Sequence, residues 1–164
     1  MGTPLSIRQA TSADLPGIGR LGALLVETHH DFDARRFLAP TSRTPVEYAK
    51  FLGSHLEDRD VVILVADDGG EVIGYAFAAV EGYDWMSLRG PAGVLHDIVV
   101  DPAHRGRGVG RLLLSAALAH LKSRGAPRVV LWTAEQNAAA QRLFASAGFR
   151  RTMIEMTREL DGAT

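Results

Sequence analysis

The sequence predicts an α+β (mixed α/β) protein built around one sheet, and three observations support this class. Apolar, β-branched runs dominate the first half of the chain. From Val94 onward, strand-like and helical segments alternate, which is typical of a sheet covered by helices. Within this part, Val94 to Thr133 should form two parallel strands joined by a crossover. The length of 164 residues predicts one domain, spanning 1–164.

Six segments are expected to be strands, because they are short and either rich in β-branched residues or alternating in polarity. They are Leu5–Arg8, Val61–Ala66, Val72–Val80, Val94–Val100, Arg128–Thr133 and Thr152–Leu160. The turn sequence Asp67-Asp68-Gly69-Gly70 joins the second and third segments, which predicts an antiparallel hairpin.

The first predicted helix follows a capping-box pattern at Thr11 and Asp14. Its apolar residues recur at helical spacing from Leu15 to Leu25. Three glycines lower its helix propensity, so its length is left open; they are Gly17, Gly19 and Gly22. We expect a loop from Phe32 to Arg43.

Three further helices have clear end signals. The second is predicted to start at Thr44, with Pro45 in the first turn and Glu47 closing a capping box. The third follows a Gly/Arg turn and ends near Arg124. The fourth covers Asn137–Ala147, before a glycine stop.

Composition excludes several classes of function. The net charge of −1 argues against a nucleic-acid binder. The absence of cysteine excludes thiolate zinc sites and cysteine nucleophiles. No apolar stretch approaches the ~20 residues of a membrane span, and no signal peptide is evident, so we expect a cytoplasmic protein without membrane contact. The run His29-His30-Asp31 lacks a known ligand spacing, so we expect no metal.

The most informative segment is Arg105-Gly106-Arg107-Gly108-Val109-Gly110-Arg111. Its glycines let backbone N–H groups approach a ligand, and it opens a helix, where such donors are unpaired and the dipole is positive. This combination predicts an anion site suited to phosphate or pyrophosphate. Neither the Walker loop nor the dinucleotide fingerprint fits its spacing. The alternative is a solvated arginine-rich turn that only starts a helix.

The chain resembles the GNAT superfamily of N-acetyltransferases. Arg105-x-x-Gly108-x-Gly110 matches its signature after a strand and an Asp-Pro loop. A second pattern, of a helix after a strand, is matched by Asn137, Ala140, Leu143 and Gly148-Phe149. The resemblance covers about a third of the chain, from Val94 to Phe149.

The resemblance implies a central mixed sheet of six to seven strands with about four flanking helices. Acetyl-CoA would lie between the splayed parallel strands Val94–Val100 and Arg128–Thr133, with a bulge near Val99. Its pantetheine would pair with the backbone of Ile98, Val99 and Val100. Its pyrophosphate would bind the turn residues Arg105, Gly106, Arg107, Gly108, Val109, Gly110 and Arg111.

Two residues of the fourth helix would also lie along the cofactor. Asn137 would hydrogen-bond the pantetheine arm, although asparagine is equally suited to cap the helix. Phe144 stands where many members have a tyrosine that protonates the leaving thiolate. Phenylalanine has no proton to give, which puts that acid step in doubt.

The implied reaction is transfer of acetyl to a primary amine of a small molecule or peptide by direct attack. His96 is the candidate base, because imidazole titrates near neutral pH. Asp97 should point to the opposite face of the strand and be structural. Candidates for the acceptor side are Glu81, Tyr83, Trp85 and His30.

Two other functions remain open at this point, a non-catalytic acyl-CoA-binding module and a nucleotide-phosphate binder of another family. A homodimer is also compatible with the sequence.

Overall fold

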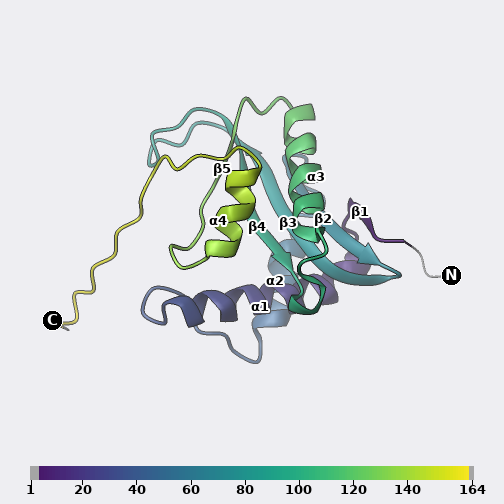
Figure 1. Cartoon of the computed structure of the whole chain (residues 1–164), viewed down its shortest axis with the longest axis horizontal. Helices are drawn as coiled ribbons and strands as arrows, with labels where there is room; N and C mark the ends of the chain where they lie inside the picture. Colours follow the sequence, from purple (N-terminus) through teal and green to yellow (C-terminus); the bar gives the residue numbers. More distant parts are fainter. Residues whose placement is uncertain (1–3, 163–164) are drawn as a thin grey trace.

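The computed structural model describes residues 4–162 and shows a five-stranded sheet between two layers of helices (Figure 1). Neighbouring strands pair antiparallel from β1 to β4, whereas β5 runs parallel to β4. The predicted hairpin and the predicted parallel pair are therefore confirmed. In sheet order the strands are β1 (Ser6–Gln9), β2 (Val61–Asp68), β3 (Glu71–Glu81), β4 (Ala92–Val100) and β5 (Val129–Leu131).

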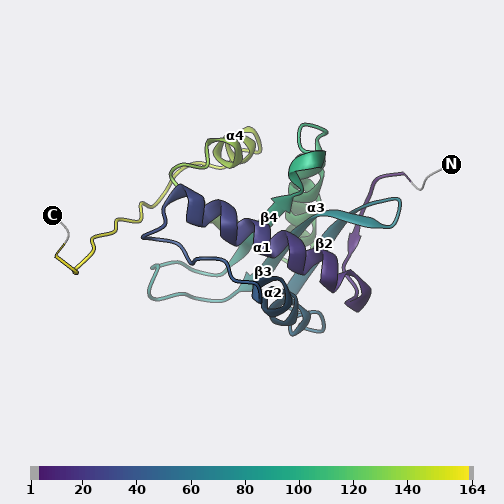
Figure 2. The ribbon, with the colours of Figure 1, turned by 90° about the horizontal axis from the view of Figure 1, so that it is seen from below.

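Four α-helices cover the two faces of this sheet. They are α1 (Leu15–Phe32), α2 (Thr44–Gly53), α3 (Val109–Ser123) and α4 (Ala138–Ser146). Figure 2 shows α1 and α2 crossing one face, with α3 on the other side. Short 3-10 turns at Ser12–Asp14 and Pro102–His104 precede α1 and the turn before α3. Within residues 4–162, none of the helices combines the length and apolarity needed to cross a membrane.

Side chains of β2 divide between two hydrophobic cores. Val62, Leu64 and Ala66 pack with α3 and Phe144. Ile63 and Val65, which alternate with them, pack with α1 and α2. Successive strand residues point to opposite faces, so a strand covered on both sides reads as one continuous apolar run.

The glycines of α1 allow α2 to approach closely. A Cβ added at Gly22 would lie 2.1 Å from Cδ1 of Tyr48, and one at Gly19 would lie 2.2 Å from the carbonyl oxygen of Pro45. These residues lower helix propensity, yet α1 continues for 18 residues to Phe32 because tertiary packing compensates. The predicted loop therefore begins one residue later, at Asp33.

The start of α1 is fixed by Asp14. Its Oδ2 accepts from the Thr11 N–H at 2.7 Å, which confirms the predicted capping box. Both terminal nitrogens of Arg8 also donate to Asp14 at 2.8 Å, and this guanidinium is the main reason that the pKa of Asp14 falls to about 2. At α2 the predicted cap is displaced, because Arg43 is the N-cap and the Thr44 hydroxyl instead accepts from the Thr41 N–H.

The sheet has five strands in the described part of the chain, so the expectation of six to seven is wrong. The missing element is Thr152–Leu160, which is extended but outside any sheet. Glu155 and Glu159 within it form ion pairs with Arg36 and Arg35, in the segment after α1. These pairs connect the segment to the loop after α1.

Candidate functional site

The two parallel strands separate soon after they pair. Only Gly93, Val94 and Leu95 of β4 have partners on β5, and no described residue pairs with β4 on that side beyond Leu95. A pocket of about 390 Å³ opens at this point. It lies between the C-terminal part of α1, β4, the end of β5 and α4, so the expected gap between the strands is present.

A bulge at His96 shapes the pocket floor. Phe77 of β3 is paired with Asp97 and Ala78 with Leu95, so His96 is the extra residue of β4. The bulge expected near Val99 is therefore misplaced. Both His96 and Asp97 line the pocket, which corrects the expectation that Asp97 faces away.

The His96 imidazole is held by a carboxylate and an aromatic ring. Its Nε2 lies 2.8 Å from Oε1 of Glu81, and Oε2 of the same carboxylate accepts from Arg89 at 2.6 Å. The ring stacks on Phe77 with centroids 5.0 Å apart. A carboxylate paired with arginine only accepts, so Nε2 is the donor and the lone pair of the neutral ring lies on Nδ1. Glu81 thus positions His96 rather than lining the pocket itself.

Asp97 is half-buried and held by two tyrosines. The hydroxyls of Tyr48 and Tyr75 both donate to Oδ2 of Asp97, the second at 3.0 Å. Burial raises the pKa of Asp97, and these hydrogen bonds oppose the rise. No donor from residues 4–162 contacts Oδ1, and this oxygen is not sealed from solvent. One carboxylate oxygen therefore remains available to a ligand in the pocket.

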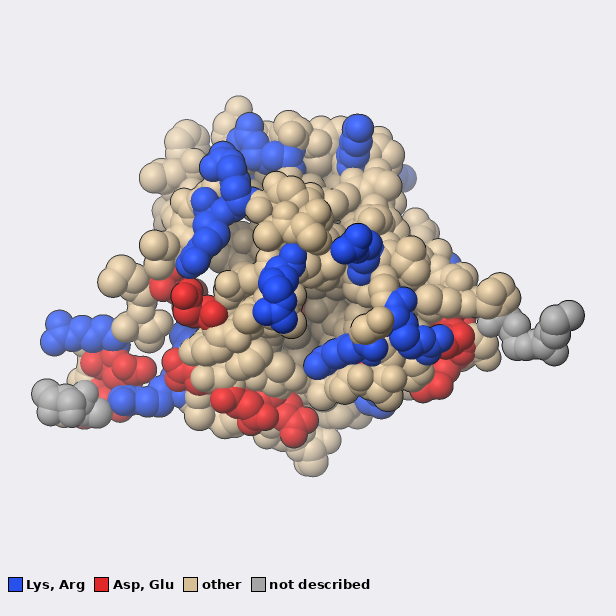
Figure 3. Space-filling view, in the orientation of Figure 1, with Lys and Arg blue, Asp and Glu red and all other residues tan. Residues whose placement is uncertain are grey.

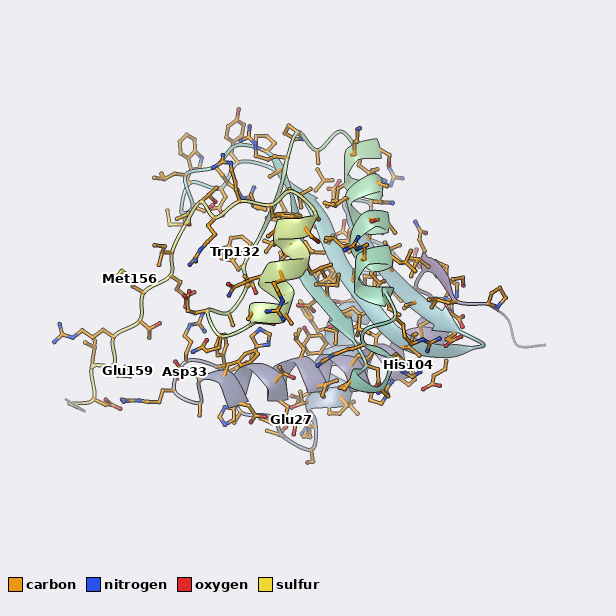
Figure 4. The ribbon with its side chains drawn as sticks, viewed as in Figure 1. Glu27, Asp33, His104, Trp132, Met156 and Glu159 are labelled. Atoms are coloured by element: carbon orange, nitrogen blue, oxygen red, sulfur yellow. The ribbon has the colours of Figure 1, made fainter. Side chains whose placement is uncertain are left out.

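Other walls of the pocket come from residues that sequence reasoning missed. His29 lines it from α1, whereas the predicted His30 turns away and pairs through Nδ1 with the Phe37 carbonyl at 3.2 Å. His29 lies four residues after Leu25, so the same helical spacing places both residues on one face of α1. Arg36 and Phe37 also line the pocket. In the view of Figure 4, Trp132 lies between α4 and the C-terminal segment.

Asn137 and Phe144 both line the pocket from α4. The side-chain oxygen of Asn137 accepts from the Ala140 N–H at 3.1 Å, so this residue is the N-cap of the helix. Its amide nitrogen donates to none of the described residues. Phe144 is 6% exposed and packs edge to face on Phe149.

Tyr83 and Trp85 do not reach the pocket. Both are exposed in the loop between β3 and β4, where their rings stack 6.3 Å apart. Val99 points into the core beneath α1 and α2, so only its backbone is available to a ligand.

The glycine-rich turn presents free donors. Gly108 is the N-cap of α3 with φ of +80°, a conformation that glycine adopts without strain. The backbone N–H groups from Gly106 to Arg111 donate to no other residue in the described range. Figure 3 shows Lys and Arg side chains gathered around the hollow between α3 and α4. Arg107 also contacts Asp68 at 3.3 Å, and Arg105 donates to the Val100 carbonyl at 3.1 Å.

In the part of the chain that the structure describes, no group of three or more His, Asp or Glu side chains is arranged to hold a metal ion. The imidazole and carboxylate groups that line the pocket are suited to proton transfer and charge recognition. The turn is suited to an anion.

Residues 24–149 match the model of the acetyltransferase (GNAT) family. Mycothiol acetyltransferase from Thermobispora bispora is 41% identical over 96 residues, which cover 56% of this chain and 31% of the relative. L-methionine sulfoximine/L-methionine sulfone acetyltransferase from Salmonella typhimurium is 40% identical over 91 residues, covering 55% of this chain and 51% of the relative. The matched part thus spans about a third to a half of these relatives.

Solved structures support the fold. A mutant of the BH1408 protein from Bacillus halodurans superposes with a TM-score of 0.81 at 22% identity, covering 94% of this chain and 99% of the other. An aminoglycoside N-acetyltransferase crystallised with CoA gives a TM-score of 0.73 at 20% identity, covering 98% and 97%.

Proposed function

Because the chain belongs to the acetyltransferase (GNAT) family, we propose that it transfers an acetyl group from acetyl-CoA to a primary amine of a small molecule or peptide. The observation that carries this proposal is the pocket where β4 and β5 separate, because it places His96 and Asp97 at one gap. A thioester laid between the strands would meet both side chains there.

The turn before α3 fits the pyrophosphate of acetyl-CoA. The unpaired N–H groups from Gly106 to Arg111 and the positive end of the helix dipole both favour a negatively charged group. Pantetheine would extend along β4 near Ile98 and Val100, on the side without a strand partner. The free amide nitrogen of Asn137 would donate to the same arm.

The acceptor amine would enter the pocket as an ammonium ion. One N–H group of the ammonium would donate a hydrogen bond to Oδ1 of Asp97, and Nδ1 of His96 would take the proton that the nitrogen must lose before it attacks. The amine nitrogen then bonds to the acetyl carbon and passes its second proton to water, and the C–S bond breaks to release the CoA thiolate. This chemistry requires no enzyme nucleophile, so the absence of cysteine is no obstacle.

The leaving thiolate finds no acid in Phe144. A thiol has a pKa of about 8.5, so the thiolate is a tolerable leaving group near neutral pH and water can protonate it. The buried, hydroxyl-free Phe144 also favours a second candidate, a non-catalytic acyl-CoA-binding module.

Thiol release from acetyl-CoA over a panel of amines tests these functions, with binding of acetyl-CoA and of ATP measured directly. The panel includes L-methionine sulfoximine and L-methionine sulfone, since the Salmonella relative is named for them. Thiol release with an acetylated product supports the transferase. Binding without release supports the module, and binding of ATP alone contradicts both.

A second test addresses the acceptor charge. Asp97→Asn should raise the KM for the accepted amine at least about tenfold, the scale of one lost charge-assisted hydrogen bond, while acetyl-CoA affinity stays unchanged. Asp60→Asn is the matched control, because Asp60 is exposed and its side chain makes no hydrogen bond to the described residues. Equal KM values in the two variants would contradict the role of Asp97.

A further inference from the structure

His29 brings a second imidazole into the pocket, from the C-terminal part of α1. Aromatic neighbours hold its ring, which packs edge to face on Phe32 and Phe37 with ring centroids 5.8 and 5.1 Å apart. Glu27, two residues earlier, is exposed and lies on the side of α1 away from α4 in Figure 4. Residues two apart point to nearly opposite sides of a helix, so His29 is directed to the side that carries the pocket.

A backbone carbonyl fixes the tautomer of His29. Its Nδ1 lies 2.8 Å from the carbonyl oxygen of Leu25, one turn earlier in the helix. A carbonyl oxygen only accepts, so Nδ1 carries the hydrogen and the lone pair of the neutral ring lies on Nε2. No residue of the range 4–162 donates to this Nε2, and the atom is not sealed from solvent. His29 therefore offers a free proton-accepting nitrogen to a ligand in the pocket.

Three residues that line the pocket each have one free acceptor atom, namely Oδ1 of Asp97, Nδ1 of His96 and Nε2 of His29. Both imidazoles lie close enough to Asp97 for their charge to act on it. Burial raises the pKa of this carboxyl, and the protonated imidazoles oppose that rise together with the tyrosine hydrogen bonds. A primary ammonium ion has three N–H donors. It therefore matches these acceptors both in number and in charge.

Acetyl transfer removes two protons from the acceptor nitrogen, and His96 can take only the first. Once protonated, its ring has no lone pair left, because Nε2 already donates to Glu81. The adduct of amine and thioester still carries the second proton, and unless the nitrogen loses it, the adduct expels the amine again instead of the thiolate. Asp97 is poorly suited to take this proton, because two hydroxyls donate to its other oxygen. A second base in the pocket therefore favours the forward reaction.

Given the acetyl transfer proposed above, on which this inference rests, we propose that His29 is the base for the second proton. As the nitrogen bonds to the acetyl carbon, its N–H proton passes to Nε2 of His29 and the electron pair of that bond stays on nitrogen. The C–S bond breaks with its electron pair on sulfur, and the CoA thiolate leaves. His29 then releases the proton to water. Of the three N–H protons, one goes to His96, one to His29, and one stays on the product amide.

Two neighbouring histidines provide a matched test. His30 also bonds to a backbone carbonyl, that of Phe37, but it does not line the pocket. In His29→Gln an amide oxygen can still accept a hydrogen bond but cannot take a proton, and glutamine is a good helix former. Thiol release with an accepted amine should show kcat lowered at least about tenfold in His29→Gln, with KM for the amine close to that of wild type. His30→Gln should keep both values, and equal kcat in the two variants overturns the inference.

Chemical rescue separates proton transfer from a structural effect. Imidazole added to His29→Ala should raise its thiol release severalfold above the rate without enzyme and should leave His30→Ala unchanged. A loss of turnover that imidazole does not relieve would mean a merely structural role and overturns the inference. Circular dichroism confirms that both variants are folded, since neither position belongs to either core.

The same assays distinguish a failure of this inference from a failure of the proposed function. A wild type that releases no thiol with any amine of the panel overturns the acetyl transfer, and the role of His29 with it. An active wild type with an equally active His29→Gln variant overturns the role of His29 alone.

Discussion

Alanine substitutions at two glycines with the same backbone conformation distinguish an effect on acetyl-CoA binding from an effect of backbone strain. Gly108 begins α3 with φ of +80°, and Gly125 follows its end with φ of +85°. A Cβ at either position would meet no atom within 4 Å. The helix between them has 15 residues and both glycines lie outside it, so the two sites are about 25 Å apart. Alanine at either position therefore incurs the same strain without a clash.

The expected magnitudes follow from this geometry. The left-handed conformation costs roughly 1–2 kcal/mol for a residue with a Cβ. For a domain of this size, each variant should therefore lower Tm by roughly 2–8 °C. In Gly108→Ala the methyl group also stands beside the free N–H groups of the turn. Losing one charge-assisted hydrogen bond to phosphate, about 1.5–3 kcal/mol, lowers acetyl-CoA affinity by roughly tenfold to a hundredfold.

Isothermal titration with acetyl-CoA and thermal unfolding without ligand give the two readouts. Gly125→Ala should lose stability but keep wild-type affinity. Gly108→Ala should lose both. If the two variants bind acetyl-CoA equally well, the turn is not the phosphate site and the reasoning from its free donors is refuted.

Three further outcomes are expected. His96→Ala should lower turnover roughly 10²-fold or more. Glu81→Gln should lower turnover by a smaller factor, because Glu81 only positions the His96 ring. Wild-type turnover in His96→Ala would exclude His96 as the base. Phe144→Tyr should fold and change thiol release by less than roughly tenfold, whereas activation of an inert wild type would favour the binding module. The hydrogen bonds from Arg8 hold the pKa of Asp14 at about 2 instead of 3.8. The ionised carboxylate therefore adds about 2 kcal/mol to the free energy of unfolding above pH 3.8. This stabilisation is lost as the pH falls toward 2. Asp14→Asn should therefore be less stable than wild type to urea at pH 6 but not at pH 2; a constant difference across that range would contradict the assignment.

Sequence patterns that span only a few residues predicted the local structure of those residues well. The capping box at Thr11 and Asp14 and the turn at Gly108 both form where the sequence places them. Asn137 is the helix cap that its residue type favours. These features depend on backbone conformation and on donors close in sequence, so a local pattern is sufficient.

The arrangement of polar groups in the pocket depends on contacts between distant segments. The register between β3 and β4 places the bulge at His96, and no pattern within β4 specifies that register. Tyr48 reaches Asp97 from 49 residues away, through an approach that Gly22 permits. The sequence therefore predicted a structural role for Asp97, and only the assembled sheet and α2 show that it lines the pocket.

The sequence by itself determined the alternation of strands and helices, the glycine-rich turn and the family to which the chain belongs, because each of these depends on residue spacing along one stretch of chain. The tertiary structure alone decided which polar groups meet in the pocket and whether Thr152–Leu160 joins the sheet. That segment has the alternation of a strand, but Arg36, 119 residues earlier, pairs with its Glu155. Periodicity specifies that a segment can be extended, whereas pairing and charge contacts between distant residues determine where it lies.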